Sequence, residues 1–385
     1  MHNTLENKGN KWYIYDRNHE GDTMEKKLEK VEAQKTKINI DEIVPELLEA
    51  IKYLAIYQTK IRDSRQKGNV YIPRLTQIEA ISSMRIEGTQ TTMSDVITNE
   101  IFPNDKKEEF IEFRNHVMAI TRGSKMIKLD GFTHERIKEI HKMMLTGIKK
   151  KNKNAPVGEY KIADNWIENS VKTKIYNPPS YTETIEYMDD LLKFMNSDEY
   201  HYHPLINAAI MHAQFESIHP FGDGNGRVGR MLVPLYLYKV NAIDVPLFYI
   251  SEAFEQDKVQ YYKNLTNSRT EGCYNLWIKF FLNKCIIQTK RHIRYFEKID
   301  ELYDATKNKI DNIIKSPNND KILDLIFDNP QITIRFLADK LEMSVTQAGR
   351  YVSKLVDAGI LISDDKQRNV SYIFSDLIDL INGNV

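Results

Sequence analysis

One run of residues near the middle of the chain constrains its fold and chemistry more than any other. Residues 218–230 read IHPFGDGNGRVGR and lie between two apolar segments with helical periodicity. Asp223 and Asn225 alternate with three glycines, so the backbone can adopt positive φ and turn its N–H groups toward an anion. We therefore expect a phosphate-binding loop between two helices.

The side chains of this run favour the same interpretation. Arg227 and Arg230 lie three positions apart at the start of the second apolar segment, so both share one helical face at its positive dipole end. Guanidinium groups placed there can bind phosphate oxygens. Asp223 can hold a divalent cation such as Mg²⁺ together with the phosphates, and His219 remains as the candidate general base. A plain turn and a structural histidine are the simpler alternatives, and the combination of residues favours the functional interpretation.

Residues 219–230 also resemble the signature of Fic domains, His-Pro-Phe-x-Asp/Glu-Gly-Asn-Gly/Lys-Arg-x-x-Arg. The resemblance implies transfer of AMP from ATP to a hydroxyl side chain of a protein, with release of pyrophosphate. It implies that His219 takes the hydroxyl proton and that Asp223 holds Mg²⁺. The expected phosphate-binding residues are Gly222, Gly224, Asn225, Gly226, Arg227 and Arg230.

A segment about 130 residues earlier is expected to restrain this site. Residues 76–79 read as a capping box and Gly88 as a C-terminal stop, which predicts a helix over 76–88. Glu87 falls in its last turn, where the helix dipole disfavours a negative charge. A carboxylate there either has a specific partner or is a solvated helix end.

The resemblance supplies a partner for this carboxylate. Residues 83–88 are similar to the Ser/Thr-x-x-x-Glu-Gly/Asn inhibitory motif of Fic proteins, with Ser83 and Glu87 in its two defining positions. The likeness implies that Glu87 pairs with Arg230 and keeps the γ-phosphate of ATP from being correctly placed.

Two further features are assigned by the same resemblance. Strand-forming residues around 166–176, stopped by two prolines, predict a β-hairpin. As a Fic flap, this hairpin would use Ile175 and Tyr176 to clamp the target by strand addition; a surface hairpin without a partner is the alternative. Tyr261 and Tyr262 could offer an aromatic surface to adenine, or could belong to the core.

The overall pattern predicts a mainly α fold: a Fic-type helical core with a small β-hairpin flap, plus a C-terminal winged helix domain. We expect a polar leader and helical region over 1–74, a Fic domain over 75–290, a linker helix over 291–318 and a winged helix-turn-helix over 319–385.

The partner of the winged helix stays open. Residues 320–385 hold seven Lys and Arg against ten Asp and Glu, a formal net charge of −3, whereas DNA-binding domains normally present positive charge. Arg350 and Lys354 nevertheless share the expected recognition helix. These residues could contact DNA, or the wing could dock a protein or form a homodimer.

Composition limits the remaining classes. Lys plus Arg and Asp plus Glu are both 54, so no general electrostatic attraction to nucleic acid or membrane is expected. The two cysteines form no metal or redox spacing, and no apolar run is long enough to span a bilayer. We expect a cytoplasmic protein whose partners are ATP and a hydroxyl-bearing protein target, which could be itself. The alternatives are a DNA-binding regulator whose Fic module senses nucleotide, and an enzyme that also removes AMP.

Overall fold

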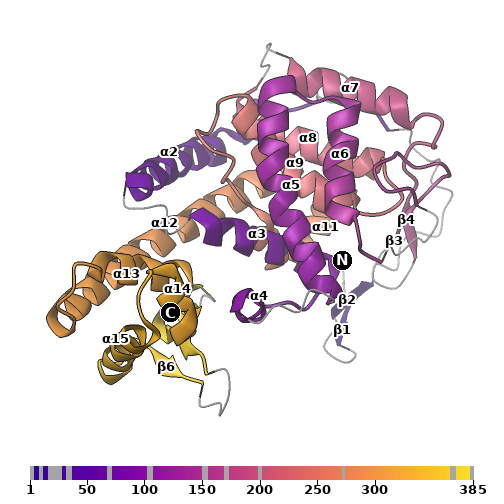
Figure 1. Ribbon diagram of the computed structural model, residues 1–385. Helices are drawn as coiled ribbons and strands as arrows, with labels where there is room; N and C mark the ends of the chain where they lie inside the picture. The colour runs from indigo at the N-terminus through magenta and orange to yellow at the C-terminus, as the bar shows by residue number, and fades with distance from the viewer. Residues whose placement is uncertain are drawn as a thin grey trace.

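The computed structural model describes residues 4–7, 12–15, 28–31, 37–66, 72–101, 107–149, 155–168, 173–197, 202–270, 274–364 and 370–381. This part of the chain is mainly helical and carries only small antiparallel sheets (Figure 1). The predicted fold class is therefore confirmed.

The chain forms a larger helical unit, which precedes the winged helix, and a smaller C-terminal unit. Two helices at the centre of the larger unit position the functional loop. Helix α8 (Pro204–Ile218) is apolar on every side, and each of its residues from Leu205 onward is buried. It begins as expected, with Pro204 in the first turn and the His203 side chain accepting a hydrogen bond from the Leu205 N–H. Helix α9 (Asn225–Lys239) follows directly after the loop and packs against α8.

Other helices surround this pair and complete the larger unit (Figure 1). Helices α5 and α6 lie on one side of α9, while α7, α11 and α12 contact α8. The surrounding elements are η1 (Ile40–Glu42), α2 (Val44–Gln66), α4 (Met93–Ile101), α5 (Glu108–Asp130), α6 (His134–Leu145), α7 (Thr184–Asn196), α10 (Ser251–Glu255) and α11 (Lys258–Thr270).

Helix α3 (Ile72–Glu87) differs from the expected helix at its N-terminus. It begins four residues before Thr76, so the capping-box prediction is wrong. The Thr76 hydroxyl instead lies 2.9 Å from the Tyr249 hydroxyl, and Glu79 accepts hydrogen bonds from Ser251. These tertiary partners take the polar groups that a capping box would have used. The C-terminus is as predicted, because Gly88 follows Glu87 with a φ of +106°.

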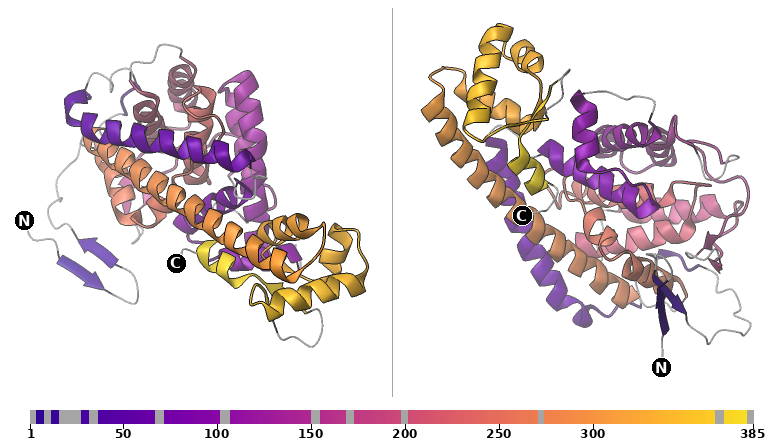
Figure 2. Two further views of the ribbon diagram at one scale, coloured as in Figure 1. Left: turned by 90° about the vertical axis from the view of Figure 1, so that its left-hand side faces the viewer. Right: turned by 90° about the horizontal axis from the view of Figure 1, so that it is seen from below.

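The expected linker helix is not a separate element. Helix α12 (Tyr274–Ile313) runs without a break from the core of the larger unit to the C-terminal unit, and α2 packs along it (Figure 2). Its residues beyond 290 still bury apolar side chains, including Phe296, Ile299 and Ile310. Charge enrichment on one face had concealed this buried stripe, so the boundary expected at residue 290 falls inside one helix.

The C-terminal unit has the predicted winged helix architecture. Its elements are α13 (Asn319–Asp328), β5 (Gln331–Ile332), α14 (Ile334–Lys340), α15 (Val345–Asp357), β6 (Ile362–Ser363), β7 (Tyr372–Ile373) and α16 (Ser375–Ile381). The strands form an antiparallel sheet in the order β5-β7-β6. Ser344 caps α15 by accepting a hydrogen bond from the Gln347 N–H at 3.2 Å, as the sequence predicted.

Two short hairpins complete the fold. Strands β3 (Ile167–Glu168) and β4 (Lys174–Tyr176) pair antiparallel, which confirms the predicted flap hairpin. Near the N-terminus, β1 (Thr4–Asn7) pairs with β2 (Trp12–Tyr15). Among the described helices, none combines the length and apolar character that a membrane span requires.

Candidate active site

The loop between α8 and α9 turns the chain sharply at two positions. His219 ends α8 in the left-handed conformation with a φ of 49°, and its N–H donates to the Phe215 carbonyl at 3.0 Å. Gly224 has a φ of 81° and precedes the first residue of α9. The expectation of positive φ is therefore met only at Gly224 among the three loop glycines, since Gly226 is helical and Gly222 is not in this conformation.

His219 is held in a form that can accept a proton. Its Nδ1 lies 3.3 Å from the Glu216 carbonyl oxygen, which can only accept a hydrogen bond, so the proton resides on Nδ1 and leaves the lone pair on Nε2. Burial lowers the pKa of His219 to about 3, and the nearby positive charge of Arg269 acts in the same direction. The imidazole is therefore neutral at physiological pH.

Asn225 holds the loop backbone through its side-chain amide. Its Oδ1 accepts from the Phe221 N–H and its Nδ2 donates to the Phe221 carbonyl, both at 2.8 Å, and only 2% of the residue is exposed. The Phe221 ring stacks on His141 at 3.8 Å, and His141 Nε2 donates to the Asp223 carbonyl at 3.0 Å. Its amide is therefore engaged by the loop backbone on both sides, and the expected phosphate contact of Asn225 stays a prediction.

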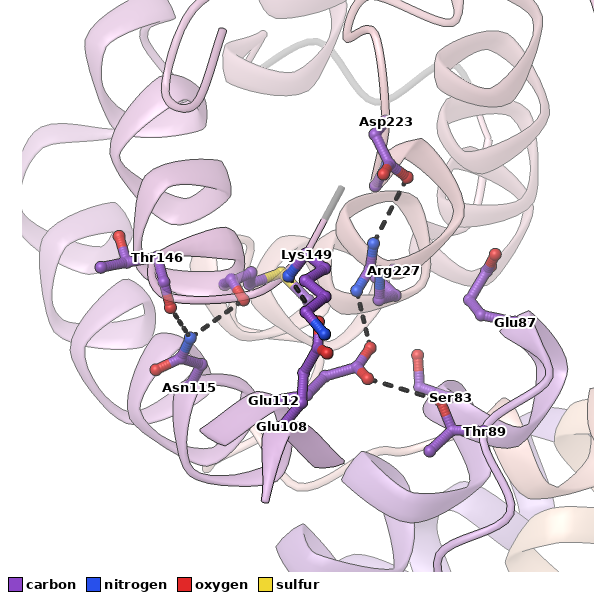
Figure 3. Close-up of polar contacts among 12 residues, drawn as sticks. Ser83, Glu87, Thr89, Glu108, Glu112, Asn115, Thr146, Lys149, Asp223 and Arg227 are labelled. Atoms are coloured by element: carbon purple, nitrogen blue, oxygen red, sulfur yellow. Dashed lines mark hydrogen bonds and ion pairs between the residues drawn. The ribbon is translucent and has the colours of Figure 1, made fainter. Parts of the chain in front are cut away.

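Arg227 lies between two carboxylates (Figure 3). Its Nη1 donates to Glu112 Oε1 at 2.6 Å, and its Nη2 is 3.5 Å from Asp223 Oδ1. The same Asp223 oxygen accepts the Gly224 N–H at 2.7 Å. Arg227 Nε has no hydrogen-bond partner among the described residues. Sequence reasoning missed Glu112, since a glutamate in an amphipathic helix looks like any solvated one.

Arg230 is tied to the end of helix α3. Its Nε donates to the Ser83 hydroxyl at 3.1 Å, while Nη2 donates to the Ser83 carbonyl and to Glu87 Oε1, both at 3.0 Å. Only 1% of Arg230 is exposed. The contact between Glu87 and Arg230 that the resemblance implied is present, and Arg230 Nη1 has no hydrogen-bond partner within the described part of the chain.

The acidic groups near the loop suit a metal that is shared with a ligand. No set of three or more His, Cys, Asp or Glu side chains with metal-binding geometry occurs among the described residues. Asp223 supplies one carboxylate beside Arg227. Such a site fits Mg²⁺, which is commonly held by one or two carboxylates, water and substrate phosphates rather than by a complete protein cage.

The remaining candidate residues are placed unevenly. Tyr261 is 1% exposed and its hydroxyl lies 3.0 Å from His212 Nε2, so it belongs to the core and offers no surface to adenine. Tyr262, by contrast, is 43% exposed. In the flap, Ile175 and Tyr176 are half-buried, and the Tyr176 ring packs on Arg269 at 5.2 Å.

The two residues considered for DNA contact also differ. Arg350 is exposed on α15. Lys354 lies on the same helix, but its Nζ donates to the Ile313 carbonyl at the end of α12, at 2.8 Å. Lys354 therefore links the C-terminal unit to α12. Arg350 makes no hydrogen bond or ion pair with the other residues that the structure describes.

The loop and the first turns of α9 thus bring together two buried arginines and a neutral histidine. Family models agree with it: residues 131–237 match the Fic/DOC family, residues 44–125 match the N-terminal region of that family, and residues 318–362 match a winged helix-turn-helix DNA-binding domain. The chain therefore carries a Fic domain of the Fic/DOC family followed by a winged helix-turn-helix.

Individual relatives lie at some distance. A protein adenylyltransferase Fic from Aedes aegypti is 29% identical over 198 residues, which cover 48% of this chain and 36% of that protein. The match thus spans about a third of that relative's length.

Solved structures share the fold. A Fic family protein from Desulfovibrio desulfuricans G20 superposes with a TM-score of 0.58 at 18% identity, over 86% of this chain and 95% of its own. A Fic domain containing signaling protein from Bacteroides thetaiotaomicron VPI-5482 gives a TM-score of 0.52 at 20% identity, over 65% of this chain and 97% of its own.

Proposed function

We propose that this protein is an adenylyltransferase that transfers AMP from ATP to a Ser, Thr or Tyr hydroxyl of a protein, either a separate target or itself. The observation that carries the proposal is the pair of buried arginines on α9, which follows the loop that holds a neutral histidine. Arg227 Nε and Arg230 Nη1 are buried N–H groups without protein partners among the described residues. Buried donors of this kind are costly unless a ligand or water satisfies them, and phosphate oxygens suit them.

The chemistry follows from these positions. His219 Nε2 accepts the proton of the target hydroxyl, whose oxygen attacks the α-phosphorus of ATP. The bond from that phosphorus to the bridging oxygen breaks, and pyrophosphate leaves. The two arginines bind and orient the phosphates. Asp223 would hold Mg²⁺, which neutralises phosphate charge when bound.

Glu87 would restrain this activity. Its carboxylate occupies Arg230, one of the two groups assigned to the phosphates. ATP bound beside an engaged Arg230 is expected to take a pose with a misaligned α-phosphate. The buried Cys285 thiol and the need for ATP support a cytoplasmic setting for such an enzyme.

The test uses the Glu87→Gly variant, which is incubated with Mg²⁺ and with ATP that carries a label in either the α- or the γ-phosphate. The proposal expects covalent label on protein from α-labelled ATP only, and at least 100-fold less in a His219→Ala variant that still binds ATP. Label from the γ-position would indicate a kinase, and equal labelling by the histidine variant would remove the base assignment.

DNA binding by the C-terminal unit is a second candidate function, supported by the winged helix-turn-helix match and by the exposed Arg350 on α15. Fluorescence anisotropy with mixed duplex DNA at low salt measures it directly. Binding that weakens steeply with salt and with Arg350→Ala would support it, and no binding at low salt would favour protein docking.

A further inference from the structure

Four successive carbonyl groups of the histidine loop accept hydrogen bonds from one short segment. The segment is 161–165, which precedes the flap strand β3, and the carbonyls belong to residues 218–221. Nothing in the assignment of base, metal or phosphate groups uses this segment, although it touches every peptide unit around His219.

Lys161 supplies two of the donors. Its backbone N–H donates to the Pro220 carbonyl at 2.8 Å, and its Nζ donates to the Ile218 carbonyl at 3.3 Å. The same ammonium group donates to the Pro179 carbonyl at 2.7 Å and to Asn165 Oδ1 at 2.9 Å. Only 5% of Lys161 is exposed. A buried ammonium with three oxygen acceptors is fully satisfied, so its position is fixed by hydrogen bonding rather than by chance contact.

Asn165 supplies the other donors. Its Nδ2 donates to the His219 carbonyl at 3.1 Å and to the Phe221 carbonyl at 3.0 Å. The Asn165 amide is oriented for this by its Oδ1, which accepts from Lys161. The left-handed conformation of His219 is unfavourable for a residue other than glycine, and these hydrogen bonds stabilise the peptide units on both sides of it.

The segment also connects the loop to the flap. Pro179 follows strand β4, and residues 161–165 precede β3, so Lys161 joins the exit of the flap to the end of α8. A target strand laid along the flap would therefore share a support with the imidazole.

We propose that Lys161 and Asn165 are positioning residues that hold His219 against the flap, so that a docked target hydroxyl and the base are registered with each other. The inference rests on the proposed adenylyl transfer. Neither residue is assigned a contact with ATP. Loss of their hydrogen bonds to the loop should therefore impair the chemical step and leave nucleotide binding in place. A displacement of about 1 Å at a reacting group can reduce the rate about 100-fold.

The experiment compares Lys161→Met, Lys161→Arg and Asn165→Asp, each in the Glu87→Gly background. Asn165→Asp keeps the shape and removes the Nδ2 donor, while Lys161→Arg keeps a cationic donor. The readouts are kcat and KM for AMP transfer, the Kd for a non-hydrolysable ATP analogue, and the melting temperature. Exposed Lys125→Met and Asn283→Asp are the matched controls.

Lys161→Met and Asn165→Asp should lower kcat about 10- to 100-fold with the Kd for the analogue changed less than about threefold, and Lys161→Arg should recover part of the loss. Unchanged kcat in both folded variants would overturn the inference. A parallel loss of kcat and analogue binding would also overturn it, because it indicates general damage to the site. If the Glu87→Gly parent itself transfers no AMP, the proposed function fails instead, and the two failures are thereby distinguished.

Discussion

At the scale of single residues, the site depends on a few buried polar groups whose neighbours set their chemistry. His219 is neutral because burial and the Arg269 charge both disfavour the imidazolium. The positive charge of Arg230 is instead stabilised, because Ser83 and Glu87 accept hydrogen bonds from its Nε and Nη2. A neutral imidazole and an arginine held by Ser83 and Glu87 therefore lie within the run 219–230.

The histidine leads to a prediction about pH. The pKa of His219 is lowered from 6.5 to about 3, so the folded protein keeps this imidazole neutral while an unfolded chain would protonate it. Because the unfolded state then binds the extra proton, His219 makes stability decrease as pH falls from about 6.5 toward 3. Histidine-selective NMR of the nucleotide-free protein, assigned with His219→Gln, should show a neutral ring down to pH 5. A midpoint near pH 6.5 would contradict this.

At the scale of elements, helices α3 and α9 approach closely because one residue of α9 has no side chain. A Cβ on Gly226 would lie 2.6 Å from Glu87 Oε1 and 2.9 Å from Arg230 Nη1. The glycine that looked like part of a flexible loop therefore leaves room for the contact between Glu87 at the end of α3 and Arg230.

This contact gives a stability prediction. Gly226→Ala should lower the free energy of unfolding by about 1–3 kcal/mol, and the loss should shrink in a Glu87→Gly background, where the clashing carboxylate is absent. Denaturant titrations of the double-mutant cycle measure both effects. The control is Gly349→Ala in α15, whose nearest neighbour would be 4.0 Å away, and it should gain about 0.5–1 kcal/mol. Equal losses with and without Glu87 would be the wrong result for this explanation.

The sequence predicted the helix ends more reliably than the tertiary contacts of polar side chains. Residues with local signals, such as Pro204 at the start of α8, Gly88 after α3 and Ser344 before α15, lie where they were expected. The partners of polar side chains were not predicted when those partners lie far along the chain, because no local sequence pattern indicates such a contact. Thr76 was assigned to a cap and instead pairs with Tyr249.

In the candidate site, too, residues within a local motif were predicted and residues brought in by the fold were not. The arginines and the histidine were identifiable because the run 218–230 is dense in chemically capable residues. Glu112 and Asn165 were not identifiable, since each is an isolated polar residue until the fold brings it to the loop. For Tyr261 the sequence allowed either an adenine-binding surface or a place in the core, and its burial shows that it belongs to the core.

At the scale of the whole molecule, the winged helix unit is docked on the helix that ends in Glu87. Arg74, near the start of α3, is 4% exposed; its Nη2 donates to the Asp328 carbonyl in the C-terminal unit and its Nη1 lies 3.6 Å from Glu100 Oε2. Thr98 on α4 donates to Gln331 Oε1 at 3.2 Å. Together with the continuous α12, these contacts join the two units.

Removing the buried arginine should loosen this junction. Arg74→Ala removes the hydrogen-bond donor to the Asp328 carbonyl and the cation beside Glu100. We therefore expect the free energy of unfolding to fall by about 1–3 kcal/mol and thermal unfolding to separate into two transitions. Scanning calorimetry measures the outcome. Arg335→Ala is the matched control, because that side chain is exposed and, among the described residues, forms an ion pair only with Asp339 in its own helix. A single transition at the parent temperature for Arg74→Ala would show that the junction contributes little.

The ion pair between Glu87 and Arg230 is proposed to restrain adenylyl transfer, so substitutions of its two partners should have opposite effects. Glu87→Gly should free Arg230 for the phosphates, whereas Arg230→Ala breaks the same pair but would also remove the proposed phosphate contact. Intact mass spectrometry after incubation with saturating ATP and Mg²⁺ counts covalent AMP per protein for the parent, each variant and the double variant. We predict more AMP on Glu87→Gly than on the parent, and none above the parent on Arg230→Ala or the double variant. Equal AMP on the parent and Glu87→Gly, with both able to modify an added target, would contradict the restraint.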